Sequence, residues 1–135
     1  MEKVILEDIY WDITLPPRQE ARIIDIVILP IEEDTWRRVI LPGNNFTIIY
    51  PLGIDYDISP IVPYEAEGTP VTLEDLLTTI YEYYQELILP DELRELTEDA
   101  NYTKPFNHRY DAIKDDWFRS LEQVSPNVYK LNLGN

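Results

Sequence analysis

The segment 72–89 limits the fold more than any other part of the chain. Thr72 is a good helix N-cap, and Asp75 stands three residues later, an arrangement similar to a capping box. Apolar residues then recur at spacings of three and four: Leu73, Leu76, Leu77, Ile80, Tyr84, Leu87 and Ile88. This pattern predicts an amphipathic helix that ends near Leu89. Its single apolar stripe has to be buried against another layer of structure.

The first half of the chain supplies strands for that layer. Residues 3–13, 36–41 and 46–50 have the apolar and aromatic content of strands. Residues 20–29 are so rich in β-branched side chains that we expect a central strand covered on both faces. The turn sequence at 42–45 (Pro-Gly-Asn-Asn) predicts a hairpin between 36–41 and 46–50.

The second half adds helices and a closing strand. Four prolines in residues 51–70 predict an irregular connection that wraps a surface. Short helices are expected at 90–98 and 108–114, and alternation over 127–133 predicts a C-terminal strand. We therefore expect one α+β domain over residues 1–135. Its sheet is mainly antiparallel, built from the N-terminal strands plus the C-terminal strand, with the 72–89 helix and shorter helices packed on it.

The charge of the chain restricts its partners. The formal net charge is −15 and is spread over both halves. It would repel nucleic acid and anionic membranes, so we expect neither to bind directly. It favours a basic protein partner, such as one that itself binds nucleic acid. The chain has no cysteine, no signal-peptide pattern and no apolar run that approaches ~18 residues, which together indicate a soluble intracellular protein.

No sequence pattern in the chain indicates catalysis, and we expect no catalytic, cofactor-binding or metal-binding residue. His108 is the only histidine; Asp111 lies one helical turn away, but no nucleophile accompanies them. The four glycines are isolated and form no phosphate-binding loop. None of the acidic pairs has the spacing of a calcium-binding loop. These pairs are Asp55/Asp57, Glu74/Asp75, Asp91/Glu92, Glu98/Asp99 and Asp115/Asp116.

The polar face of the predicted helix offers a candidate contact site. Tyr84 belongs to the apolar stripe, whereas we expect Tyr83 to point away from it, beside Glu82 and Glu86. A tyrosine surrounded by acids suits a basic partner. Glu74, near the start of the same helix, completes the set of predicted partner-binding residues.

Two stretches of the C-terminal half resemble a known group of domains. One runs from Pro70 to Tyr84 (PVTLEDLLTTIYEYY), and the other joins Trp117–Leu121 (WFRSL) to Asn127–Gly134 (NVYKLNLG). Both are similar to uncharacterised domains encoded by large nucleocytoplasmic DNA viruses, with looser relatives in fungi. Arg119 and Ser120 depart from the usual Glu-Gly of that family. The resemblance implies no established activity, but it implies a viral protein made in an infected cell or packaged in a particle.

Three functional hypotheses follow. The first is a non-enzymatic, acidic interaction module that binds a basic protein. The second is a viral structural or assembly component, which would form a homo-oligomer through apolar and tyrosine-rich surface. The third is a small enzyme, which would need an enclosed pocket that holds His108 or paired acids.

Overall fold

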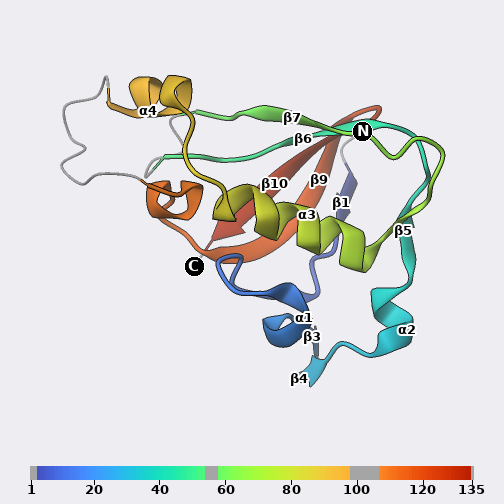
Figure 1. Cartoon of the computed structure of the whole chain (residues 1–135). Coiled ribbons are helices and arrows are strands. Elements are labelled where there is room, and N and C mark those ends of the chain that lie inside the picture. The colour runs from blue at the N-terminus through green and yellow to red at the C-terminus, as the bar shows by residue number, and fades with distance from the viewer. Residues whose placement is uncertain (1–2, 54–57, 98–106, 135) are drawn as a thin grey trace.

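Helix α3 (Leu73–Gln85) lies across one face of a five-stranded sheet (Figure 1). The computed structural model describes residues 3–53, 58–97 and 107–134. The strand order is β1 (Lys3–Ile5), β9 (Trp117–Ser125), β10 (Val128–Gly134), β6 (Phe46–Ile49) and β7 (Ile61–Tyr64). Neighbouring strands are antiparallel except β10 and β6, which are parallel. The fold is therefore α+β with a mainly antiparallel sheet, as predicted.

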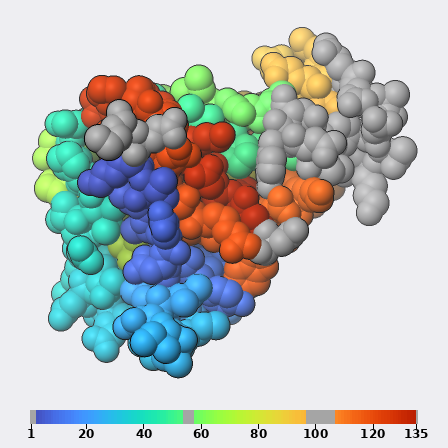
Figure 2. Space-filling model, turned by 180° about the vertical axis from the view of Figure 1, so that it is seen from behind, coloured from blue at the N-terminus to red at the C-terminus, as the bar shows by residue number. Residues whose placement is uncertain are grey.

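The long hairpin β9–β10 forms the centre of this sheet. The chain reverses at Asn127, whose φ is 60°. Tyr129 and Leu131 are buried, whereas Lys130 is exposed on the other face, which confirms the predicted alternation of the C-terminal strand. On that second face, strands β9 and β10 reach the molecular surface (Figure 2).

Two smaller sheets and several short helices surround the main sheet. The first small sheet contains β2 (Ile9–Tyr10), β3 (Arg22–Asp25) and β4 (Val27–Pro30) in that order, and all its pairs are antiparallel. The second pairs β5 (Val39–Leu41) with β8 (Val71–Thr72). The remaining helices are α1 (Pro17–Glu20), α2 (Glu33–Trp36), α4 (Pro90–Thr97) and the 3-10 helix η1 (Arg109–Ala112). No helix in the described parts of the chain is long and apolar enough to cross a membrane.

The apolar stripe of α3 fills the core. Leu76, Leu77, Ile80 and Tyr84 are completely buried. A large apolar side chain buried in this way contributes roughly 1.5–3 kcal/mol. The Tyr84 hydroxyl donates to the Pro51 carbonyl at 2.7 Å, so its polar end is satisfied inside the core. The stripe packs in one cluster with side chains from both halves of the chain, among them Trp11, Ile13, Ile48, Leu52, Leu121 and Leu131.

The predicted central strand at 20–29 is wrong. The chain reverses at Ile26, so this segment forms the β3–β4 hairpin, and most of its side chains are exposed. Asp25 divides the apolar run at the turn, where a carboxylate can stay in water. The predicted strand at 3–13 is also divided, because the backbone turns at Leu6, whose φ is 62°. Its two parts, β1 and β2, belong to different sheets.

The predicted hairpin between 36–41 and 46–50 is also wrong. Strand β5 pairs with β8, while β6 pairs with β7 and β10. The connection at 42–45 is held by a distant part of the chain, because the Gly68 N–H donates to the Gly43 carbonyl at 2.8 Å. A side chain at Gly43 would meet the Gly68 carbonyl carbon at 2.4 Å, so only glycine allows this approach. The predicted helix 72–89 is shorter than expected, since Glu86 is already extended.

We predict that Thr72→Ala lowers the free energy of unfolding by about 1 kcal/mol. The Thr72 hydroxyl accepts a hydrogen bond from the Asp75 N–H at 3.2 Å, and the Asp75 carboxylate accepts one from the Thr72 N–H at 3.0 Å. This is the predicted capping box at the start of α3. Urea denaturation would measure the loss, with Thr72→Ser as the control that keeps the hydroxyl. An equal stability of all three proteins would contradict a role for the cap.

Candidate interaction surface

Tyr83 does not point into solvent as predicted; it is only 5% exposed. Its ring stacks on Tyr50, with centroids 3.8 Å apart and an interplanar angle of 11°. The physical reason is helix geometry, because Tyr83 follows Ile80 by three residues and Leu76 by seven. That spacing places Tyr83 within the apolar stripe. It is a core residue and not part of an exposed contact site.

Arg109 closes the cluster around Tyr83. Its guanidinium carbon lies 4.1 Å from the centre of the Tyr83 ring. The side chain donates to the Tyr83 carbonyl at 3.1 Å, to Glu86 at 3.0 Å and to Glu92 at 3.1 Å. Burial alone would lower the Arg109 pKa, but the nearby Tyr83 and the two carboxylates outweigh it, so the pKa is raised. Arg109 thus joins α3, α4 and η1 and leaves this cluster internally satisfied.

The other predicted contact residues are not gathered in one exposed patch. Glu86 belongs to the Arg109 cluster, and Glu74 forms an ion pair with Arg18. Arg18 also pairs with Glu33 at 2.7 Å. Glu82 is exposed on α3. The helix therefore presents isolated acids without the aromatic anchor that we expected at Tyr83.

The single histidine has a local role in the structure. The backbone N–H of His108 donates to the Asp111 carboxylate at 3.0 Å, and the imidazole ring stacks on Tyr110 with centroids 4.8 Å apart. Within the described ranges, no group of three or more His, Asp or Glu residues is placed to hold a metal ion. The acidic pairs Asp55/Asp57 and Glu98/Asp99 lie outside the described residues.

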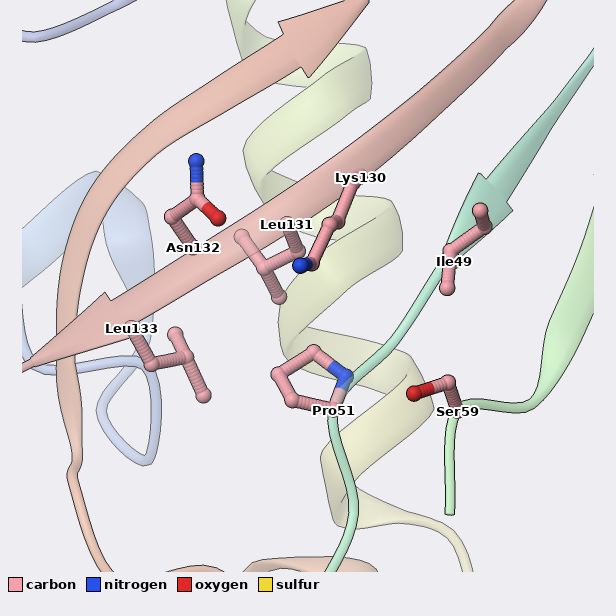
Figure 3. Close-up of a pocket in the computed structure, with 7 residues that line it drawn as sticks. All are labelled: Ile49, Pro51, Ser59, Lys130, Leu131, Asn132 and Leu133. Carbon is pink, nitrogen blue, oxygen red and sulfur yellow. The ribbon is translucent and has the colours of Figure 1, made fainter. Parts of the chain in front are cut away.

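A shallow hollow of about 310 Å³ opens on the sheet face away from α3 (Figure 3). Lys130 and Asn132 of β10 reach it from one side, and Ser59 and Ile49 reach it from the other. The Asn132 amide donates to the Ser120 hydroxyl at 3.0 Å, so part of its hydrogen-bonding capacity is already used. The hollow combines one cation with a few neutral groups, and this set does not match a recognisable reaction.

The most unusual surface of the protein is the β3–β4 hairpin. Five large apolar side chains within six positions are between 43% and 101% exposed. Soluble proteins rarely leave such a contiguous patch uncovered unless it serves an interaction. The hairpin stands at one end of the molecule, far from α4 (Figures 1 and 2). The exposed residues are Ile24, Ile26, Val27, Ile28 and Leu29.

The tip of the hairpin has a strained backbone. Ile26, which is fully exposed, has a φ of 64°. A left-handed conformation costs a residue with a side chain roughly 1–2 kcal/mol, and β-branched residues are especially rare there. The fold thus tolerates both an exposed apolar side chain and an unfavourable conformation at one position. Such costs are typical of functional sites.

A groove with a mixed polar and apolar lining continues the hairpin towards the main sheet. It has a volume of about 260 Å³ and is lined by Glu7, Ile9, Tyr10, Ile24, Trp117, Phe118 and Arg119. The Tyr10 ring packs on Trp117, with centroids 4.7 Å apart. Tyr10 pairs with Arg22, which is two residues from Ile24, so Tyr10 and Ile24 share one face of the small sheet. We call Tyr10 together with the five exposed hairpin residues the hairpin surface.

Acidic residues predominate in the segment that carries the hairpin surface, and we call the exposed ones among them the acidic rim. Residues 7–34 contain eight Asp or Glu and two Arg, with no Lys. Asp8, Asp25, Glu32 and Asp34 are exposed. An apolar patch with an acidic rim is complementary to a partner that carries apolar residues among positive charges.

Sequence reasoning missed the hairpin surface because it assigned this apolar run to the core. One available signal was length, since Ile23 to Ile31 is longer than the usual strand of five or six residues. The second was Asp25, a charge that a strand covered on both faces could not hold. The burial of Arg109 had no comparable local signal, because its three partners lie on α3, just after α3 and on α4, at least 17 residues away in the sequence.

We predict that Ile26→Asn raises the free energy of unfolding by about 1 kcal/mol. Asparagine adopts the left-handed conformation more readily, and the exposed isoleucine loses no core contact. Chemical denaturation would measure the gain. Ile61→Asn is the matched control, because Ile61 is also exposed but is not among the residues with a positive φ. A loss of stability in Ile26→Asn would show that Ile26 supports the fold.

We predict that Arg109→Ala lowers the free energy of unfolding by about 3 kcal/mol, because it leaves the largely covered carboxylate of Glu92, 12% exposed, without its cation. The double variant Arg109→Ala/Glu92→Gln should be more stable than Arg109→Ala alone, since the unpaired charge is removed. Thermal and urea unfolding would provide both comparisons. Additive losses from the two substitutions would contradict this account.

Residues 9–127 match the model of a family of unknown function (DUF6699). No curated protein and no solved structure matches the chain. The family match extends beyond the C-terminal half on which the resemblance was based, and it includes the hairpin surface, α3 and all of β9. Because the match spans most of the chain, the chain belongs to this family of unknown function (DUF6699).

Proposed function

We propose that the chain is a non-enzymatic protein-interaction module that binds its partner through the hairpin surface. The observation that supports this proposal is the exposure of five large apolar side chains on β3 and β4. Covering them would remove their apolar area from water, which is the main source of affinity in protein association. In contrast, the polar cluster around Arg109 is already satisfied by groups of the same chain.

The charge of the chain supports a basic partner. The formal net charge is −15, and the segment that forms the hairpin surface is strongly acidic. Complementary charges around an apolar contact speed association and exclude acidic competitors. We therefore propose that apolar contacts provide most of the affinity, while the acidic rim selects a basic protein. Binding should weaken as salt is added.

The hairpin surface also favours a second candidate, an assembly component. Strand β4 is the last strand of its sheet, and an apolar edge strand is a common site of self-association. The resemblance to viral domains would fit a particle protein. Light scattering at increasing protein concentration separates the two candidates, because self-assembly produces oligomers and the interaction module stays monomeric without its partner.

We predict that Val27→Thr/Leu29→Thr weakens partner binding by at least about tenfold, because it removes two apolar contacts. Threonine keeps the β propensity of the strand. The matched control is Ile61→Thr on β7, where the side chain is 66% exposed, compared with 57% for Val27. A photoreactive residue at position 26 would crosslink the partner in extract, and mass spectrometry would give the yield at low and high salt.

The expected result is a basic protein that wild type and Ile61→Thr capture equally, and that the double variant loses. Its yield should fall with salt. Equal capture by all three proteins would contradict docking through the hairpin surface. Capture of predominantly acidic proteins would contradict the role of charge.

A further inference from the structure

We infer that the partner binds as an added strand on the open edge of β4, through an extended segment in which apolar residues alternate with Lys or Arg. This inference rests on the proposed function and specifies how the hairpin surface is used. Among the residues that the structure describes, the sheet order β2-β3-β4 leaves one edge of β4 without a neighbouring strand. All four residues of β4, Val27–Pro30, are exposed.

The hydrogen-bond pattern shows which backbone groups face this edge. The Ile24 N–H donates to the Asp8 carbonyl at 2.8 Å, so the backbone groups of Ile24 point towards β2. Ile24 lies opposite Ile28 in the β3–β4 pair. In an antiparallel ladder, opposite residues either exchange both hydrogen bonds or exchange none. Ile24 and Ile28 exchange none, and the N–H and C=O of Ile28 therefore point outward from the sheet edge.

The outward edge of β4 is short and has no charged residue. Proteins usually protect an edge strand with charges, a bulge or a proline. In β4 the protective feature is Pro30, which cannot donate a hydrogen bond to an added strand because it has no N–H. Ile28 therefore provides the outward donor and acceptor at the centre of β4. With so few backbone bonds, side-chain contacts on both faces of the added strand have to provide much of the affinity.

Both faces of β4 offer such contacts. Ile28 lies beside Ile24 on the face that continues to Tyr10 and the groove, while Val27 and Leu29 are exposed on the opposite face. Because successive residues of a strand point to opposite faces, the apolar residues of the added strand would extend the Ile24–Ile28 face. Its Lys or Arg side chains would lie on the face of Val27 and Leu29, where their aliphatic stems can pack.

The charges identify the occupant as a basic segment. Asp25 lies opposite Val27 at the end of the hairpin and therefore shares the face of Val27 and Leu29. The Lys or Arg residues of the added strand would lie on this same face and approach the Asp25 carboxylate. A second copy of this chain is disfavoured, because each copy carries a net charge of −15.

The test uses a synthetic peptide in which valine and lysine alternate, and a peptide of equal charge in which glycine replaces valine. We expect the valine peptide to bind at least about tenfold more tightly. Amide hydrogen exchange followed by NMR should show that it protects the Ile28 N–H.

Ile28→Pro removes the outward N–H without removing a β3–β4 hydrogen bond. It should weaken binding of the valine peptide roughly fivefold, the effect of one lost hydrogen bond. Ile28→Val, which keeps the N–H, should bind nearly as wild type does. If NMR shows that Ile28→Pro is misfolded, two N-methylated valine peptides test the hydrogen bonding to β4 on the wild-type protein. Each peptide carries N-methyl groups along one of its two backbone edges. One of the two should bind more weakly.

The outcomes separate this inference from the proposed function. Equal binding by Ile28→Pro and Ile28→Val, or by both N-methylated peptides and the unmodified one, would overturn strand addition while leaving the hairpin surface as the docking site. Equal binding of the valine and glycine peptides would overturn the alternating apolar segment. A concentration-dependent dimer with a protected Ile28 N–H would make a second copy the occupant. Unchanged partner crosslinking by Val27→Thr/Leu29→Thr would instead refute the proposed function.

Discussion

The burial of the α3 stripe against the inner face of the main sheet is the interaction on which the rest of the structure depends. Leu76, Leu77, Ile80 and Tyr84 are fully buried there, in contact with a core that draws on both ends of the chain. The strand order β1-β9-β10-β6-β7 places the C-terminal hairpin between N-terminal strands, so neither half can complete the sheet alone. In the β3–β4 hairpin, Ile23 packs against this core, whereas Ile24, Val27, Ile28 and Leu29 stay exposed.

The two ends of the molecule differ in whether the groups they carry have partners within the same chain. At the α4 end, the Arg109 guanidinium is paired with the carboxylates of Glu86 and Glu92, so these charges have partners within the chain. At the opposite end, the hairpin surface is apolar, strained at Ile26 and bordered by acids. Stability alone would favour a polar residue at the tip and fewer apolar side chains on β4. A partner that covers the hairpin surface, as proposed above, would explain these unfavourable features.

The sequence predicts the elements that depend on local periodicity and capping. Helix α3 with its Thr72–Asp75 cap, helix α4 and the alternating strand β10 all lie within a residue or a few residues of the predicted bounds. Long-range pairing was not predictable in the same way, because the partners of β5 and β6 are set by contacts such as Gly43 with Gly68. The hairpin surface was missed for a related reason. Apolar content does not show whether other layers cover a strand, so residues 20–29 were assigned to the core. The prediction that Tyr83 points into solvent was a different error, since its spacing from Leu76 and Ile80 already placed it in the apolar stripe.

The most direct test of the central claim measures whether a partner covers the hairpin surface in the cell. Hydroxyl-radical footprinting of the purified protein and of the protein in its native extract would compare oxidation at residues 24–29 with oxidation at Ile61 and Leu87, which are also exposed. We expect strong labelling of the hairpin in the purified protein and protection of it in the extract, with Ile61 and Leu87 labelled equally in both. Equal labelling of the hairpin in both samples would contradict the claim that this surface is a docking site.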